Sequence, residues 1–89
     1  MRQKLVVGNW KMHGSMAQVR QLLEGVATGS ADLKKVEIAV GPTLLHIGLA
    51  AEVCAGEAAG HLKLAAQNLF AEPAGAFTGE VSAPMLAEY

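Results

Sequence analysis

The stretch that decides the fold is KLVVGNWKM, residues 4–12. Two β-branched valines beside a leucine, followed by Gly8, are typical of a short buried strand. Because alternate residues of a strand share a face, Asn9 and Lys11 are predicted to lie on the same face as Leu5 and Val7. That face changes from apolar to polar at the carboxyl end of the strand. Folds that alternate strands and helices place their ligand sites at this end.

A helix is predicted after this strand. Ser15 stands three residues before Gln18, which is the spacing of a capping box. One face of the helix is then formed by apolar residues at helical spacing, namely Val19, Leu22, Leu23 and Val26. Gly29 is predicted to end the helix in a left-handed turn.

The same alternation continues along the chain. A second strand is predicted over residues 36–40 and ends before Gly41-Pro42. A helix is predicted over residues 43–54, with Leu44, Ile47 and Ala51 on its inner side, and a third strand over residues 62–67. Residues 68–81 show no periodicity, and Ser82 is placed to cap a further helix.

The order is therefore β-α-β-α-β-loop-α over one unit, residues 1–89. Such an order implies parallel strands joined by right-handed crossovers. Parallel sheets are almost always buried on both faces, and two helices cover only one. An exposed apolar strand residue costs roughly 1.5–3 kcal/mol. The open face is therefore expected to be covered, either by more strands of the same chain or by another molecule.

Composition excludes several classes of protein. The 89 residues carry 7 basic and 8 acidic side chains, a net charge of -1, which argues against a nucleic-acid binder. The single cysteine, Cys54, is predicted to be a small core residue in a reducing compartment. The sequence offers no apolar stretch long enough to span a membrane, no signal peptide and no cluster of metal ligands. A soluble, cytoplasmic chain without a cofactor is expected.

Lys11 is the candidate for chemistry. A lysine at the carboxyl end of a strand offers three donors and a positive charge, which suit a phosphate or a developing oxyanion. Asn9 beside it is a neutral group that can orient a ligand. The alternative is that Lys11 is a solvated loop lysine, and its spacing from the strand alone does not decide between the two.

Two blocks of sequence resemble the triosephosphate isomerase family. The first is GNWKMHG, residues 8–14, and the second is AQN, residues 66–68, followed by GAFTGEVSAPML, residues 75–86. The resemblance runs over all 89 residues, with the expected strands and helices between the blocks. His13 stands where Asn is more usual, and residues 69–74 are a variable part of the loop.

The resemblance implies a (β/α)8 TIM barrel, of which this chain supplies the first three strands, the two helices between them, the long loop and the start of the third helix. It also implies that Lys11 is a catalytic-site lysine that binds the phosphate region of the substrate and steadies the enediolate, with Asn9 as a substrate-binding neighbour. The implied reaction is proton transfer between the first two carbons of a triose phosphate, which interconverts dihydroxyacetone phosphate and glyceraldehyde 3-phosphate in glycolysis and gluconeogenesis.

The proton-transfer groups of that family, a glutamate base and a histidine, have no counterpart in these residues. His13, His46 and His61 do not match the position of the family's histidine, and each is predicted to be a structural or surface residue. The isolated chain is therefore expected to be inactive.

The resemblance further implies that residues 68–81 form a dimer loop. Its tip, with Phe77, Thr78, Gly79 and Glu80, would enter a second subunit, where Met12 lines the receiving pocket and Thr78 approaches Asn9 and Lys11. Loops this long in compact domains are usually functional or disordered. The alternative is that Phe77 folds back onto the third helix of its own chain.

Two other functions stay open. One is a non-catalytic module that associates with itself, or with a complementary piece, through open strand edges and Phe77. The other is a phosphate-binding domain without chemistry.

Overall fold

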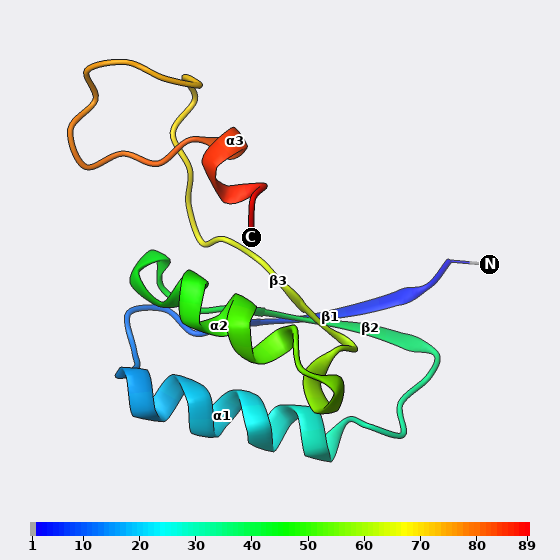
Figure 1. The fold of residues 1–89 in the computed structure, drawn as a ribbon. Coiled ribbons are helices and arrows are strands. Elements are labelled where there is room, and N and C mark those ends of the chain that lie inside the picture. Colours follow the sequence, from blue (N-terminus) through cyan, green and yellow to red (C-terminus); the bar gives the residue numbers. More distant parts are fainter. Residues whose placement is uncertain (1) are drawn as a thin grey trace.

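The computed structural model describes residues 2–89. Figure 1 shows helices lying along the strands, with a long loop and a short helix at the carboxyl-terminal side. The elements in chain order are β1 (Lys4–Asn9), α1 (Met16–Gly29), β2 (Val36–Gly41), α2 (Ile47–Cys54), β3 (Leu62–Leu64) and α3 (Ala83–Leu86). Short 3₁₀ turns, η1 (Leu44–His46) and η2 (Glu57–Ala59), precede and follow α2.

The sheet is parallel with the order β1-β2-β3, as predicted. In the register, Lys4 lies opposite Val36 and Asn9 opposite Gly41, while Ile38 lies opposite Leu62. This βαβαβ arrangement, with its strands in sequential order, agrees with the first three strands of the predicted (β/α)8 barrel.

The predicted capping box of α1 is confirmed. The Ser15 hydroxyl accepts from the Gln18 backbone N–H at 3.2 Å, and the Gln18 side-chain oxygen accepts from the Ser15 N–H at 3.0 Å. The helix ends at Gly29, as predicted, but the predicted left-handed turn is wrong, because Gly29 does not adopt a positive φ. Ser30 caps the helix instead, and its hydroxyl donates to the Val26 carbonyl at 2.6 Å.

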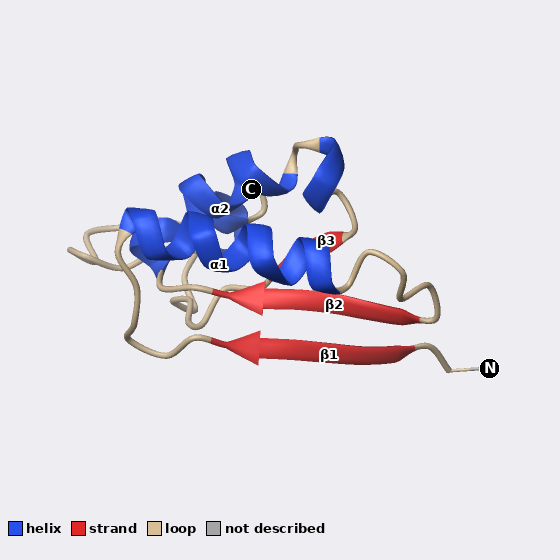
Figure 2. Cartoon of the chain, turned by 90° about the horizontal axis from the view of Figure 1, so that it is seen from below, coloured by secondary structure: helices blue, strands red, loops and turns tan. Residues whose placement is uncertain are grey.

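Both long helices cover the same face of the sheet (Figure 2). The core lies between them and the strands, and its fully buried members are Val19, Leu23, Ala27, Val40, Ala50, Ala59 and Leu62. This packing follows from the helical spacing of the apolar residues of α1, which places Val19, Leu23 and Ala27 on one stripe.

The first strand has little cover. Leu5, Val6 and Val7 are 57%, 58% and 48% exposed. On the face away from the helices, Lys63 donates to Glu37 at 2.6 Å across β2 and β3. The prediction that two helices leave one face of the sheet open is confirmed.

Two predicted elements differ from the structure in their limits. The segment 43–54 begins with the turn η1 before it becomes α2, and Leu44, predicted on the inner side, is exposed. The third strand ends at Leu64 rather than Gln67, because residues 65–67 leave the ladder after Ala65 N–H donates to the Val40 carbonyl. Between residues 2 and 89, no helix combines the length and apolar character needed to cross a membrane.

Candidate functional site

The carboxyl ends of the three strands meet at one edge of the sheet. Asn9 ends β1, its register partner Gly41 ends β2, and the chain leaves β3 toward Gln67 nearby. A parallel sheet gathers its strand ends in this way, so residues distant in sequence come together at the edge.

Lys11 lies just beyond β1 in an unusual backbone conformation. Its φ is +55°, a left-handed value that, among non-glycine residues in the described part of the chain, Lys11 alone adopts. Its backbone N–H donates to Asn9 Oδ1 at 2.8 Å. The strand therefore ends before Lys11, and the predicted two-residue alternation does not extend to it. A left-handed lysine costs about 1 kcal/mol or more, and such strain is concentrated at functional sites.

Gln67 fixes this conformation from the other side. Its Nε2 donates to the Lys11 carbonyl at 2.8 Å and to the Gly41 carbonyl at 2.7 Å. The Gly41 carbonyl also accepts from the Trp10 N–H at 3.0 Å. One amide side chain thus joins the ends of β1 and β2, and neither partner can be predicted from local sequence.

The side chain of Lys11 is exposed. Within residues 2–89, the side chains that form an ion pair are those of Lys63 and Glu37. Lys11 is therefore a cation on a strained, hydrogen-bonded backbone without a carboxylate partner in that segment. An arrangement of this kind can bind a phosphate or stabilise negative charge on a substrate oxygen.

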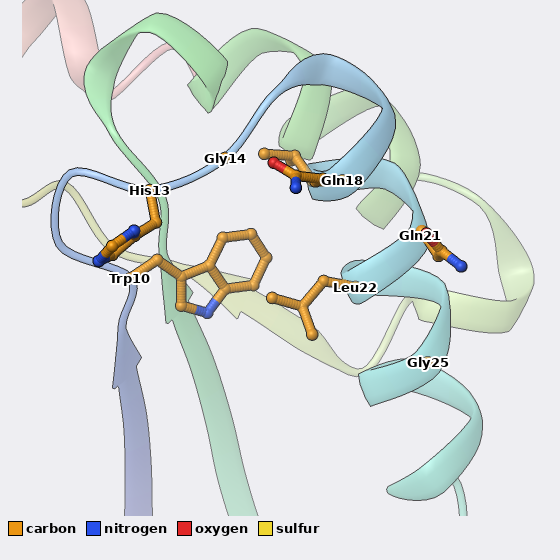
Figure 3. A pocket seen from close by; sticks show the side chains of 8 residues that line it. Trp10, His13, Gly14, Gln18, Gln21, Leu22 and Gly25 are labelled. Atoms are coloured by element: carbon orange, nitrogen blue, oxygen red, sulfur yellow. The ribbon is translucent and has the colours of Figure 1, made fainter.

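A pocket of about 490 Å³ lies beside this edge, between the β1–α1 loop and α1. Its lining comprises Trp10, His13, Gly14, Gln18, Val19, Gln21, Leu22 and Gly25. In Figure 3 the Trp10 indole extends from the loop toward Leu22 of α1, and His13 turns away on the other side. Asn9 and Lys11 are not part of the lining, so this pocket is separate from the predicted site.

Two of the three histidines have structural contacts. His46 is buried at the end of η1, rather than in mid-helix as predicted, and its Nδ1 lies 3.3 Å from Thr43 Oγ1. His61 Nε2 lies 2.8 Å from Ser30 Oγ, just after α1. Both side chains have partners outside the Lys11 region of the sequence, as expected for structural histidines.

Cys54 lies at the end of α2. Partial burial raises the pKa of its thiol above the ordinary value. This shift opposes thiolate formation, which agrees with the prediction that Cys54 is a packing residue. No group of three or more potential metal ligands occurs within residues 2–89.

The predicted dimer residues lie on exposed segments. Met12 is 90% exposed, and Phe77 is 44% exposed. The Phe77 ring contacts Phe70 of its own loop, with ring centroids 4.5 Å apart. The Glu80 N–H donates to the Phe77 carbonyl at 3.0 Å, so Thr78 and Gly79 occupy the turn between them. The insertion of this tip into a second subunit stays a prediction.

Comparison with known proteins identifies the family. The family model described as "Triosephosphate isomerase" matches residues 4–89. Proteins named triosephosphate isomerase from Cupriavidus necator and Dechloromonas aromatica are each 45% identical over 89 residues, which is 100% of this chain and 34% of each relative. The one from Actinobacillus pleuropneumoniae serotype 3 is 36% identical over 88 residues, 99% of this chain and 34% of that relative.

The chain thus spans about a third of the length of the curated relatives that it matches. The match covers both sequence blocks, the three parallel strands and the edge that carries Asn9, Lys11 and Gln67. The chain belongs to the triosephosphate isomerase family.

Proposed function

We propose that this chain supplies the positively charged group, Lys11, of an isomerase site that interconverts dihydroxyacetone phosphate and glyceraldehyde 3-phosphate. The observation that supports it most is the left-handed Lys11, held between Asn9 Oδ1 and Gln67 Nε2 at the carboxyl edge of the sheet. The Lys11 ammonium binds the phosphate region and stabilises the enediolate, and Asn9 orients the substrate. No cofactor or metal takes part, and the reaction belongs to glycolysis and gluconeogenesis in the cytoplasm.

The isolated chain is proposed to be inactive. General acid–base transfer typically contributes about 10²–10⁴-fold in rate. His46 and His61 have structural partners, and His13 does not match the histidine of the family. Lys11 alone provides charge but neither abstracts nor returns the proton.

The active form is proposed to be a homodimer. The tip of the 68–81 loop, with Phe77, Thr78, Gly79 and Glu80, enters a pocket of the second subunit that Met12 lines. Support comes from the exposure of Met12 and from the turn that presents Thr78 and Gly79. A two-fold axis makes the exchange reciprocal.

A second candidate function is a non-catalytic module that associates with itself or with a complementary piece. The exposed Leu5, Val6 and Val7 of β1 favour it, because an uncovered strand with unpaired edge groups attracts another chain. Sedimentation of the Val7→Lys variant distinguishes it, since this change disperses oligomers that form through β1 and leaves intact a dimer that forms through the 68–81 loop. A third candidate, a phosphate binder without chemistry, requires saturable binding of a triose-phosphate analogue by the isolated chain.

A chimera tests the main proposal. Residues 1–89 replace the matching segment of the Cupriavidus necator relative, and isomerisation of glyceraldehyde 3-phosphate is measured for this chimera and for its Lys11→Ala variant. We expect turnover by the chimera and a loss of about 10²–10³-fold in the variant, the usual cost of removing one group that stabilises an oxyanion. A folded chimera whose turnover does not depend on Lys11 would contradict the proposal.

A further inference from the structure

The loop between β3 and α3 is closed by its own backbone. The Phe70 N–H donates to the Val81 carbonyl at 2.8 Å, and Phe70 forms a parallel bridge with Ser82. The segment 70–82 therefore begins and ends at the same place, as in a compact Ω-loop. Figure 1 shows it projecting from the rest of the chain, beyond α3.

Two aromatic rings form the interior of this loop. The rings of Phe70 and Phe77 lie with centroids 4.5 Å apart and planes inclined by 41°. Tilted aromatic pairs at this separation are favourable beyond the area that they bury. The pair connects the base of the loop to its far side.

Gly75 makes room for this pair. Its φ is +142°, and a Cβ placed there would lie 2.6 Å from Phe77 Cε2 and 3.0 Å from Phe77 Cδ2. The Phe77 ring would have to shift to make room for such a Cβ. The backbone conformation favours glycine at this position, and an added side chain would also displace the ring of the pair.

We propose that Phe70 and Gly75 are positioning residues that hold the 70–82 loop in its projecting shape before it meets a second copy of this chain. The contact of Phe77 with Phe70 holds the tip, from Phe77 to Glu80, in the position in which it is presented. The inference rests on the proposed dimer for the identity of the partner. A preformed loop binds more tightly, because the apparent affinity decreases as the fraction of molecules in the binding conformation decreases.

The test measures hydrogen exchange by NMR in dilute chain, at the amides of Phe70 and Glu80, which donate to Val81 and Phe77. Phe70→Leu removes one ring and Gly75→Ala adds the clashing Cβ. Leu69→Ala is the matched control, because it removes exposed apolar surface next to the loop but outside the ring pair. Phe70→Tyr keeps the ring and is expected to behave as the unmodified chain.

We expect both amides to be protected in the unmodified chain and to exchange about threefold to tenfold faster in Phe70→Leu and Gly75→Ala. Sedimentation of the same variants is expected to show a dimer dissociation constant that rises by the square of the ratio of closed-loop populations, because each dimer contains two such loops. Unprotected amides in the dilute unmodified chain would overturn the proposal, as would protection that Phe70→Leu leaves unchanged. Protection without association at any concentration would support the preformed loop and contradict the proposed dimer.

Discussion

On one face of the sheet, α1 and α2 bury a contiguous core around Leu23, whose side chain is 0% exposed. On the other face and along β1, comparable aliphatic side chains such as Leu5 and Val7 remain in solvent. The same strands supply both surfaces, so the difference lies in what covers them. The covered face holds these residues together, and the open face is where further strands or a partner would pack. The candidate site lies at the carboxyl ends of the strands that carry both faces.

The largest test of this contrast compares Leu23→Ala with Leu5→Ala. We expect Leu23→Ala to lower the free energy of unfolding by about 2–5 kcal/mol, because it opens a cavity in the core. Leu5→Ala is expected to cost under about 1 kcal/mol, because its side chain is already in solvent. Urea unfolding followed by circular dichroism measures both. Equal costs would mean that the open face is covered in solution.

The next test concerns the amino-terminal cap of α1, a helix that covers one face of the sheet. Ser15→Ala removes the hydroxyl that accepts from the Gln18 N–H and is expected to cost about 0.5–2 kcal/mol. Met16→Ala, at an exposed neighbouring position, serves as the control and is expected to stay within about 0.5 kcal/mol. The same urea titration measures both, and an equal response would show that the capping box contributes nothing.

Substitution of Lys11 tests the backbone conformation at the carboxyl ends of the strands. Because Lys11 has a φ of +55°, Lys11→Gly is expected to be about 0.5–1 kcal/mol more stable than Lys11→Ala, which keeps the strain. Thermal unfolding of the two variants measures the difference. A more stable alanine variant would show that the left-handed conformation does not persist in solution.

The smallest expected effect concerns Cys54 on the helical side. Because burial raises the pKa of its thiol, native chain is expected to react with iodoacetamide severalfold more slowly than chain unfolded in urea at the same pH. The neutral thiol is favoured in the folded state, so its contribution to stability is complete below the ordinary thiol pKa. That contribution is lost as the pH rises through the folded-state value. Equal alkylation rates would contradict the burial.

Local sequence predicts the features that depend on local contacts. The capping box needs only Ser15 and Gln18, three residues apart, and the parallel strands follow from alternating apolar segments. The end of α1 at Gly29 was predicted correctly, but its left-handed turn was not, because Ser30 caps the helix and its hydroxyl donates to the Val26 carbonyl.

The candidate site was predicted only in part, because its geometry depends on contacts between residues that are distant in the sequence. Asn9 and Lys11 were identified from their position after a strand, but the left-handed backbone of Lys11 depends on Gln67, 56 residues later. The block AQN, residues 66–68, was the available signal for Gln67, but it does not reveal which carbonyl groups Gln67 contacts. The contact between Phe70 and Phe77 likewise depends on the closure of the loop, which residue spacing does not reveal.

The most direct measurement of the central claim is steady-state turnover of glyceraldehyde 3-phosphate by the purified 89-residue chain, beside its Lys11→Ala variant. If Asn9 and Lys11 bind and orient the substrate but residues 1–89 supply no proton-transfer group, both proteins give the same background rate. Turnover by the unmodified chain that disappears in Lys11→Ala would contradict the account.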